Sequence, residues 1–424
     1  MNDVALYVFR KPSVTSFSSA IPHIMLFKDI IGQNEIKQHL AEMVEHNRLS
    51  HALLFLGKEG SGALPLAIAF AQYILSQPTA KAQQPTVDLF GNAEPAAAAG
   101  FIHPDEIASQ PAFVRANDLI HPDLHFSYPV IPKKSGDKPI STDYISEWRE
   151  FVKLHPYGNV YDWLQFIGAE NKQGNITAHE CADIIRKLNL KTFESEYKVL
   201  VMWMPEYLGN EGNKLLKLIE EPPANTLFIL VAENESQILP TILSRTQLVK
   251  IPALETADIA RALTERAKLQ PDQARQTAAV SEGNYREALL LLQHAEEDWQ
   301  GLLRSWLNAI LKTGPAAQVK WVDDVSKLGR ERQKQFLRYF NHLLEQAIRL
   351  QAIGEQYIEL PENEKDFAGR LNKIATMEQQ QAMIQELDNA VYYIERNANA
   401  KLLFHALTIK LYHIIARNEL IVVT

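Results

Sequence analysis

A short apolar run that leads directly into a glycine-rich loop is the feature that most restricts how this chain can fold. Residues 52–56 read Ala-Leu-Leu-Phe-Leu, and Gly57-Lys-Glu-Gly-Ser-Gly62 follows at once. A fully apolar run of this length is typical of a strand in a parallel sheet that is buried on both faces. Residues 66–75 then return to the apolar spacing of a helix. Strand, glycine loop and helix in this order predict a phosphate-binding loop in an α/β fold.

The loop keeps the glycine frame of such a motif but lacks its reactive end. A working loop has the pattern G-x-x-x-x-G-K-[ST], in which backbone amides bind phosphate, the lysine reaches the β- and γ-phosphates and the hydroxyl ligates Mg²⁺. Gly57 and Gly62 have the right spacing, with an extra Gly60, but the last two positions hold Ala63 and Leu64. We expect the three glycines to form a relic cofactor-binding loop that binds nucleotide weakly or not at all. A structural turn without any ligand is an equal alternative.

Composition places the chain among ordinary globular proteins. Its 424 residues predict two or three domains. The contents of 46% hydrophobic and 22% charged residues are usual, and the net charge of −8 argues against a protein that coats polyanions. Cys181 is the one cysteine, which excludes an internal disulfide and a cysteine-based zinc cluster. No apolar run reaches the roughly 18 residues of a membrane span, so we expect a cytoplasmic protein with no membrane partner.

Strand and helix patterns alternate as far as residue 252. Further apolar runs predict strands at 199–204 and 227–231, and Gln247-Leu-Val-Lys-Ile251 is interpreted as a fourth strand. This alternation predicts a doubly wound parallel sheet over 25–252. Beyond it the patterns are helical, which predicts a small helical lid at 253–297 and a larger helical domain at 298–424.

Two segments lack these patterns. Residues 1–24 are Ser-rich and aperiodic, and we expect a disordered extension or a start codon assigned too early. Residues 77–120 are rich in Ala, Pro and Gln, and residues 129–142 are irregular. We therefore expect an insertion of poorly ordered loops over about 77–142.

Several separated segments resemble the clamp-loader subunits of bacterial DNA polymerase III, which are AAA+ proteins. The two most specific are Asn213–Pro223, which ends in Glu-Glu-Pro-Pro, and Leu239–Arg245, which reads Leu-Pro-Thr-Ile-Leu-Ser-Arg. The resemblance is strong over residues 25–300 and implies an AAA+ α/β domain, a helical lid and an all-α collar. Other similar segments are Phe27–Gln33, Ser50–Gly57, His121–His125, Gly283–Ala288 and Glu395–Leu403.

Within this family the delta-prime type has lost its ATPase function, and a second motif of this chain fits that type. The segment 199–204 is similar to the Walker B strand, which ends in acidic residues that hold Mg²⁺. Those positions are Trp203 and Met204, and neither side chain has an oxygen to ligate a hard cation. Loss of the lysine, the hydroxyl and the carboxylate together is hard to reconcile with hydrolysis. The resemblance implies a component of the DNA polymerase III holoenzyme that is not an enzyme by itself.

Arg245 is the residue that the resemblance marks as functional. In the family the arginine of this Ser-Arg pair, Ser244-Arg245 here, reaches the ATP site of a neighbouring subunit and acts in trans as an arginine finger. The alternative is a surface arginine that caps the preceding helix. Arg286 takes the sensor 2 position, which touches the nucleotide in an active relative. Without a competent site, we expect Arg286 to form an inter-domain ion pair.

The resemblance also implies the partners: tau/gamma-type and delta-type subunits, primer–template DNA within the complex and, indirectly, the sliding clamp. We expect no cofactor of its own, since ATP and Mg²⁺ would be bound by neighbouring subunits. We also expect no metal and no zinc module, because residues 77–125 contain no cysteine. A metal site has only weak support in the sequence, from the alternate positions His121, Asp123 and His125. Two alternatives stay open: an active AAA+ ATPase with an unconventional phosphate loop, and a degenerate AAA+ scaffold outside replication.

Overall fold

The computed structural model describes residues 26–78, 101–134, 136–169, 172–293, 298–354, 362–395 and 398–417. The chain divides into two compact units, Met1–Gln293 and His294–Thr424, and each is described by itself. The extension expected at 1–24 lies outside the described residues.

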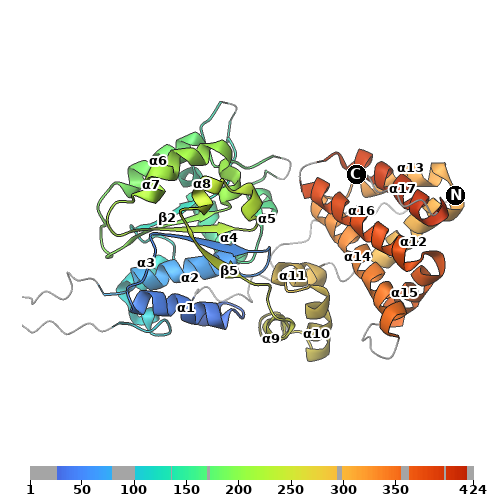
Figure 1. Ribbon diagram of the computed structural model, residues 1–424, viewed down its shortest axis with the longest axis horizontal. Coiled ribbons are helices and arrows are strands. Elements are labelled where there is room, and N and C mark those ends of the chain that lie inside the picture. Colours follow the sequence, from blue (N-terminus) through green and yellow to red (C-terminus); the bar gives the residue numbers. More distant parts are fainter. Residues whose placement is uncertain are drawn as a thin grey trace, which may run out of the picture. The chain divides into compact units, whose positions relative to one another are not determined.

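The first unit is built on a parallel sheet (Figure 1). Its strands are β1 Ala52–Gly57, β2 Leu124–Ser127, β3 Lys198–Trp203, β4 Thr226–Ala232 and β5 Gln247–Ile251. They lie in the order β2-β3-β4-β1-β5, and every neighbouring pair is parallel. Because β1 lies between β4 and β5, the glycine loop that follows it leaves from the interior of the sheet.

Both faces of this sheet are buried. Successive side chains of a strand point to opposite faces, and in β3 they enter two different core clusters. Val199, Val201 and Trp203 belong to one cluster, whereas Leu200 and Met202 belong to the other. Burial on both faces is the reason that the strand segments read as continuous apolar runs.

Helices cover the two faces, with α1 to α3 on one side of the sheet and α6 to α8 on the other in Figure 1. The elements of the first cluster are α1 Asn34–Glu45, α2 Ala63–Leu75, α3 Pro111–Asn117, α4 Ile145–Leu154 and α5 Val160–Phe166. Those of the second are α6 Ala178–Leu188, the 3₁₀ segment η6 Pro205–Leu215, α7 Leu216–Glu220 and α8 Pro240–Leu243. Shorter 3₁₀ turns are η2 Phe27–Asp29, η4 Ile107–Ser109, η5 Ser141–Tyr144 and η7 Glu235–Gln237.

The structure corrects the insertion expected at 77–142. Residues 79–100 lie outside the described residues, but 101–142 contain α3 and β2, and β2 pairs with β3 at the edge of the sheet. This strand has only four residues, Leu-His-Phe-Ser, so its apolar pattern is too short to be recognised in the sequence.

Three helices, α9 Thr256–Arg266, α10 Pro271–Val280 and α11 Tyr285–Gln293, follow the last strand and complete the first unit. Their small core contains Ile259, Leu263 and Ala278, and it also includes Ile31 and Tyr157 from the α/β part. These three helices therefore pack against the α/β part through a shared apolar cluster.

The described part of the second unit is helical. It comprises α12 Trp299–Asn308, the π-helical segment η8 Ala309–Thr313, α13 Pro315–Val325, α14 Arg330–Ile353, α15 Glu362–Ile374, α16 Met377–Glu395 and α17 Ala400–Arg417. Phe336, Phe340, Leu343 and Ala347 of α14 are buried in its core. None of the helices within the described ranges has the length and apolar character that a membrane span requires.

Candidate functional site

The glycine loop joins the interior strand β1 to the buried helix α2. Gly60 and Gly62 have φ angles of 72° and 87°, a left-handed backbone that glycine adopts without strain. Gly62 is also the N-cap of α2. The three glycines expected to form the loop therefore lie where a phosphate loop has them, between a strand and the N-terminus of a helix.

Little space is left over this loop. The cavity bordered by Gly57, Gly62 and Leu64 has a volume of about 20 Å³, which is room for about one water molecule. Small-molecule sites usually measure about 300–1,000 Å³. Tyr157 fills part of the space, since its ring lies so close to Gly62 that a Cβ there would be 3.1 Å from Cε1. The Tyr157 hydroxyl is held by the Ile31 amide, which donates to it at 2.9 Å.

Arg286 is bound to two carboxylates beside the loop. Its Nε and Nη2 donate to Oδ2 and Oδ1 of Asp162 at 2.5 and 2.6 Å, and its Nη1 donates to Oε1 of Glu59 at 2.9 Å. The Arg286 side chain is only 5% exposed. Charge-assisted and bidentate bonds of this kind are the strong ones. The ion pair expected for Arg286 is confirmed: it joins α11 to α5 and to the glycine loop.

Asn284 and Tyr285 bring the backbone of the helical group into contact with the same loop. The Tyr285 amide donates to the Gly60 carbonyl at 3.2 Å. A Cβ on Gly60 would lie 1.8 Å from Oδ1 of Asn284, so this close approach requires glycine. Asn159, the N-cap of α5, donates its Nδ2 to Oε2 of Glu59 at 3.1 Å. The loop is therefore occupied by groups of the chain itself.

The position where a magnesium-binding carboxylate is expected is part of an aromatic core. Trp203, the last residue of β3, has its ring 5.3 Å from that of Trp148 and 6.0 Å from that of Phe151, centroid to centroid. Leu64 at the start of α2 is buried in the same cluster. Apolar and aromatic side chains offer no oxygen ligands to Mg²⁺. Within the described ranges, no group of three or more His, Cys, Asp or Glu side chains could hold a metal ion.

The comparisons with known proteins agree with the fold. A family model described as "DNA polymerase III, delta subunit" matches residues 32–88 and 109–255. The delta' subunit of DNA polymerase III from Bacillus subtilis is 25% identical over 264 residues, which are 62% of this chain and 60% of that protein. The tau subunit from the same organism is 23% identical over 327 residues, 76% of this chain and 46% of that protein.

The chain belongs to the clamp-loader family of DNA polymerase III subunits. Its parallel sheet, followed by a helical group and by a second unit whose described part is helical, is the order of α/β and all-α parts expected from the sequence. The match covers about half to three fifths of these relatives' own length.

Among solved structures, a gamma subunit-related protein from Thermotoga maritima covers 89% of this chain and 98% of its own, at 14% identity and a TM-score of 0.36. The RuvB Holliday junction branch migration motor from the same organism covers 77% and 80%, at 12% identity and the same TM-score. A TM-score of 0.36 is too low to support any further conclusion.

The family's Ser-Arg pair lies at the surface of the α/β part. Arg245 follows α8, and its side chain is 31% exposed. Nη1 donates to the Thr241 carbonyl at 2.9 Å and to Oγ of Ser244 at 3.3 Å, while Nε donates to Oε2 of Glu220 at 3.2 Å. The isolated chain thus has the helix-capping contact that the sequence left as an alternative. The same contacts join the Ser-Arg and Glu-Glu-Pro-Pro segments, and the exposed ion pair with Glu220 is weak enough to be exchanged for another partner.

In this clamp-loader-family chain, the His-Pro-Asp segment is a structural anchor. The carboxylate of Asp123 is buried and accepts three backbone amides, from Phe193, Glu194 and Ser195, at 2.7, 2.8 and 2.9 Å. His121 is buried, and its Nε2 lies 3.2 Å from Oγ of Ser195. These bonds fix residues 193–195, which lead into β3. They account for the buried His121 and Asp123 without a metal ion.

We expect His125 to make folding depend on pH. Burial, helped by Lys187 and Lys198 and opposed by Asp123 and Asp183, lowers the pKa of His125 from 6.5 to about 4. In the unfolded chain His125 binds a proton below about pH 6.5, whereas in the folded chain it binds a proton only below about pH 4. Stability is therefore full above pH 6.5 and falls as the pH drops towards 4, by about 2 kcal/mol between pH 7 and pH 5.

Urea unfolding of the wild type and of His125→Gln at pH 7 and pH 5 measures this effect. The glutamine variant should lose about 2 kcal/mol less stability than the wild type over this interval. Equal losses in the two proteins would show that His125 is not the group responsible.

Sequence reasoning missed Glu59, Asp162 and Tyr157. Two of them had a signal: an acidic residue within a phosphate loop opposes an anionic ligand, and Asn159-Val-Tyr-Asp162 has the spacing of a helix-capping box. No sequence pattern indicates that Tyr157 lies over Gly62, because only the tertiary fold brings them together.

Proposed function

We propose that this chain is a clamp-loader subunit of the delta-prime type, which does not hydrolyse ATP and supplies Arg245 to the ATP site of a neighbouring subunit. In the complex it would help to place the ring-shaped sliding clamp on primer–template DNA during replication. Its partners would be tau/gamma-type and delta-type subunits, and ATP and Mg²⁺ would be bound by those neighbours.

The closed phosphate loop is the observation that supports this proposal most. A site for ATP needs a positive charge and amide donors directed at the phosphates, and oxygen ligands for Mg²⁺. Here Arg286 is already neutralised by Glu59 and Asp162, and about 20 Å³ of space is left over the loop. Trp203 and Leu64 make the metal position apolar. Each of these features opposes nucleotide binding independently of the missing lysine.

The position of Arg245 supports the second half of the proposal. An arginine finger must be accessible so that it can enter a neighbour's site. Arg245 is a surface residue that ends one of the two sequence segments most specific to the family. Its fork of donors is suited to bind phosphate oxygens. An exposed ion pair with Glu220 contributes only about 0–1 kcal/mol, so exchange of this partner for a phosphate has little cost.

Titration calorimetry of the full chain with ATP and Mg²⁺ tests the closed site. We expect no binding tighter than a Kd of about 1 mM, whereas a tau/gamma-type subunit with an intact loop serves as the positive control. Tight, Mg²⁺-dependent binding by this chain would overturn the proposal and favour an active ATPase.

Co-expression with tau/gamma-type and delta-type subunits of the same organism tests the partners. We expect the chain to co-elute with them as one complex in size-exclusion chromatography. Failure to join that complex would favour a role outside replication, even if the calorimetry shows no nucleotide binding.

A further inference from the structure

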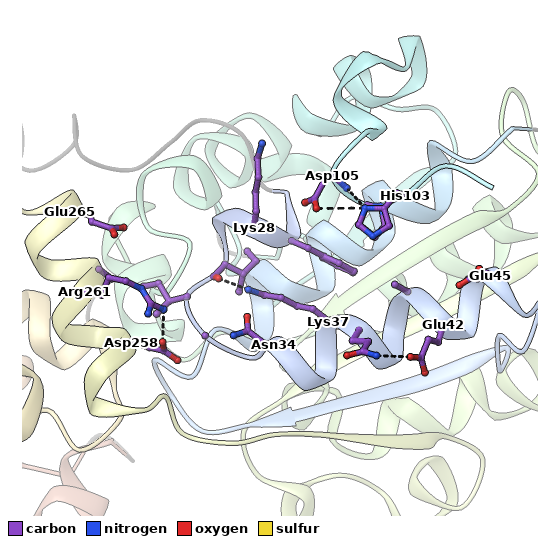
Figure 2. A pocket seen from close by; sticks show the side chains of 18 of the residues that line it. Lys28, Asn34, Lys37, Glu42, Glu45, His103, Asp105, Asp258, Arg261 and Glu265 are labelled. Carbon is purple, nitrogen blue, oxygen red and sulfur yellow. Dashed lines mark hydrogen bonds and ion pairs between the residues drawn. The ribbon is translucent and has the colours of Figure 1, made fainter. Parts of the chain in front are cut away.

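A cavity of about 640 Å³ in the first unit does not select a charged ligand. It lies between α1, α9, the turn η2 and residues 101–105 (Figure 2). Five carboxylates and four cations line it, and Asp258 is bound to Arg261, Oδ1 to Nη2 at 2.5 Å. Because both signs of charge surround the same space, neither an anion nor a cation is favoured there. The loop that joins α6 to β3 is more informative.

This loop, residues 189–197, exposes two large apolar side chains. Phe193 is 81% exposed and Leu190 is 61% exposed, although both residue types are usually buried. Single apolar side chains are common on protein surfaces, so exposure alone does not indicate a binding site. What distinguishes this loop is the way in which its backbone is held.

Two buried charged groups fix the backbone of the loop. The Nζ of Lys198 donates to the carbonyls of Leu188, at 2.8 Å, and of Leu190. The carboxylate of Asp123 accepts the amides of residues 193–195. Lys198 and Asp123 are only 3% and 2% exposed, and buried charges need such hydrogen bonds to be stable. Both exposed apolar side chains are therefore attached to a backbone that is fixed before any partner binds.

A fixed backbone favours binding through these side chains. Ordering a loop on binding costs free energy, and a loop that is already ordered avoids this cost. Phenylalanine is enriched in the buried centres of protein–protein interfaces and is depleted from ordinary surfaces. Phe193 therefore has the properties of an anchor that enters an apolar recess of a partner protein.

The edge of the sheet that carries this loop also carries Arg245. All strands of a parallel sheet begin at the same edge, and the loop precedes β3 as Arg245 precedes β5 (Figure 1). The ion pair of Arg245 with Glu220 already reaches from the start of β5 towards the start of β4, which is next to β3. Three strand spacings separate β5 from β3, which corresponds to about 14 Å.

We propose that the loop 189–197 docks on the subunit whose ATP site Arg245 enters, with Phe193 as the anchor. This inference rests on the proposed function, because Arg245 determines which partner faces this edge of the sheet. An interface of standard size covers about 800 Å² of each partner, or about 30 Å across, so an interface centred on Arg245 extends to β3. The neighbour would then have an apolar recess about 15 Å from its ATP phosphates.

Titration of a fluorescently labelled tau/gamma-type subunit with the full chain, in the presence of ATP and Mg²⁺, tests the docking loop. Phe193→Ala should weaken the Kd by about 10- to 100-fold, as expected for a Phe side chain that becomes buried. Leu190→Ala should weaken it by a smaller factor. Lys191→Ala is the matched control, because Lys191 is exposed on the same loop, and its Kd should equal that of the wild type. Urea unfolding should show equal stability for all four proteins.

ATP turnover of the assembled complex separates docking from catalysis. Because the contact acts on affinity, an excess of the Phe193→Ala chain should restore turnover, whereas an excess of the Arg245→Ala chain should not. Turnover that stays low with saturating Phe193→Ala would contradict a role of Phe193 in docking alone.

The outcomes distinguish this inference from the proposed function. If the wild type binds the tau/gamma-type subunit and Phe193→Ala binds it equally well, the docking loop is wrong and the proposed function stands. If the wild type does not bind that subunit, the proposed function fails and the docking loop fails with it. If Phe193→Ala loses binding to the sliding clamp but keeps its Kd for the tau/gamma-type subunit, the clamp occupies the loop and the proposal is overturned.

Discussion

Replacement of Arg245 with alanine is expected to lower ATP turnover at the adjacent site of the assembled clamp loader by about 10³-fold, because a finger of this kind contributes about 10³–10⁵ in rate. The side chain lies at the surface, 31% exposed, and its partners in the isolated chain are a surface carboxylate and a carbonyl, so the substitution should leave folding nearly unchanged. Rapid-quench measurement of the ATP hydrolysed per complex checks the expected loss of turnover. The fast phase should lose the contribution of one site, and clamp loading should fall with it.

Two variants control this experiment. Arg245→Lys keeps the charge but loses the fork of donors, so it should recover little of the activity. Glu220→Gln removes the ion-pair partner of Arg245 and leaves the arginine free, so turnover should stay at the wild-type level. Unchanged ATP hydrolysis and clamp loading with Arg245→Ala would mean that Arg245 only caps α8.

Arg286→Ala should destabilise the first unit by about 3–5 kcal/mol. Removal of one member of a buried ion pair takes away the charge that balances the others, and here Glu59 and Asp162 would both lose Arg286. The effect should be concentrated where α11 meets the glycine loop. Amide hydrogen exchange of the full chain measures the opening free energy of each segment, and peptides covering α10, α11 and residues 57–62 should exchange faster.

Arg275→Ala is the matched control in the same group of helices. Arg275 pairs with Asp272 on the surface, with side chains 71% and 84% exposed, and such a pair contributes less than about 1 kcal/mol. The two variants therefore remove the same chemical group from a buried and from an exposed ion pair. Equal amide exchange rates in the Arg286→Ala and Arg275→Ala variants would mean that the contacts of Arg286 do not hold the helices α9 to α11 on the glycine loop.

Much of the α/β fold was predictable because its strands are buried on both faces. β1, β3 and β4 each contain a continuous apolar run of at least five residues. β1 also leads into a glycine loop whose left-handed angles at Gly60 and Gly62 only glycine adopts easily. The four-residue edge strand β2 was not predictable. Its place in the sheet depends on pairing with β3, and its neighbouring Asp123 is fixed by amides of residues 193–195.

The sequence by itself determined that this chain has a phosphate-loop fold without the lysine, hydroxyl and carboxylate of an ATPase, because those groups are defined by their positions in short motifs. Only the tertiary structure decided what occupies the loop instead. Glu59, Tyr157, Asp162 and Arg286 come from segments far apart in the chain, and their distances depend on the packing of α5 and α11 against β1 and α2. Ion pairs and ring contacts depend on distance and burial, which no local sequence pattern contains.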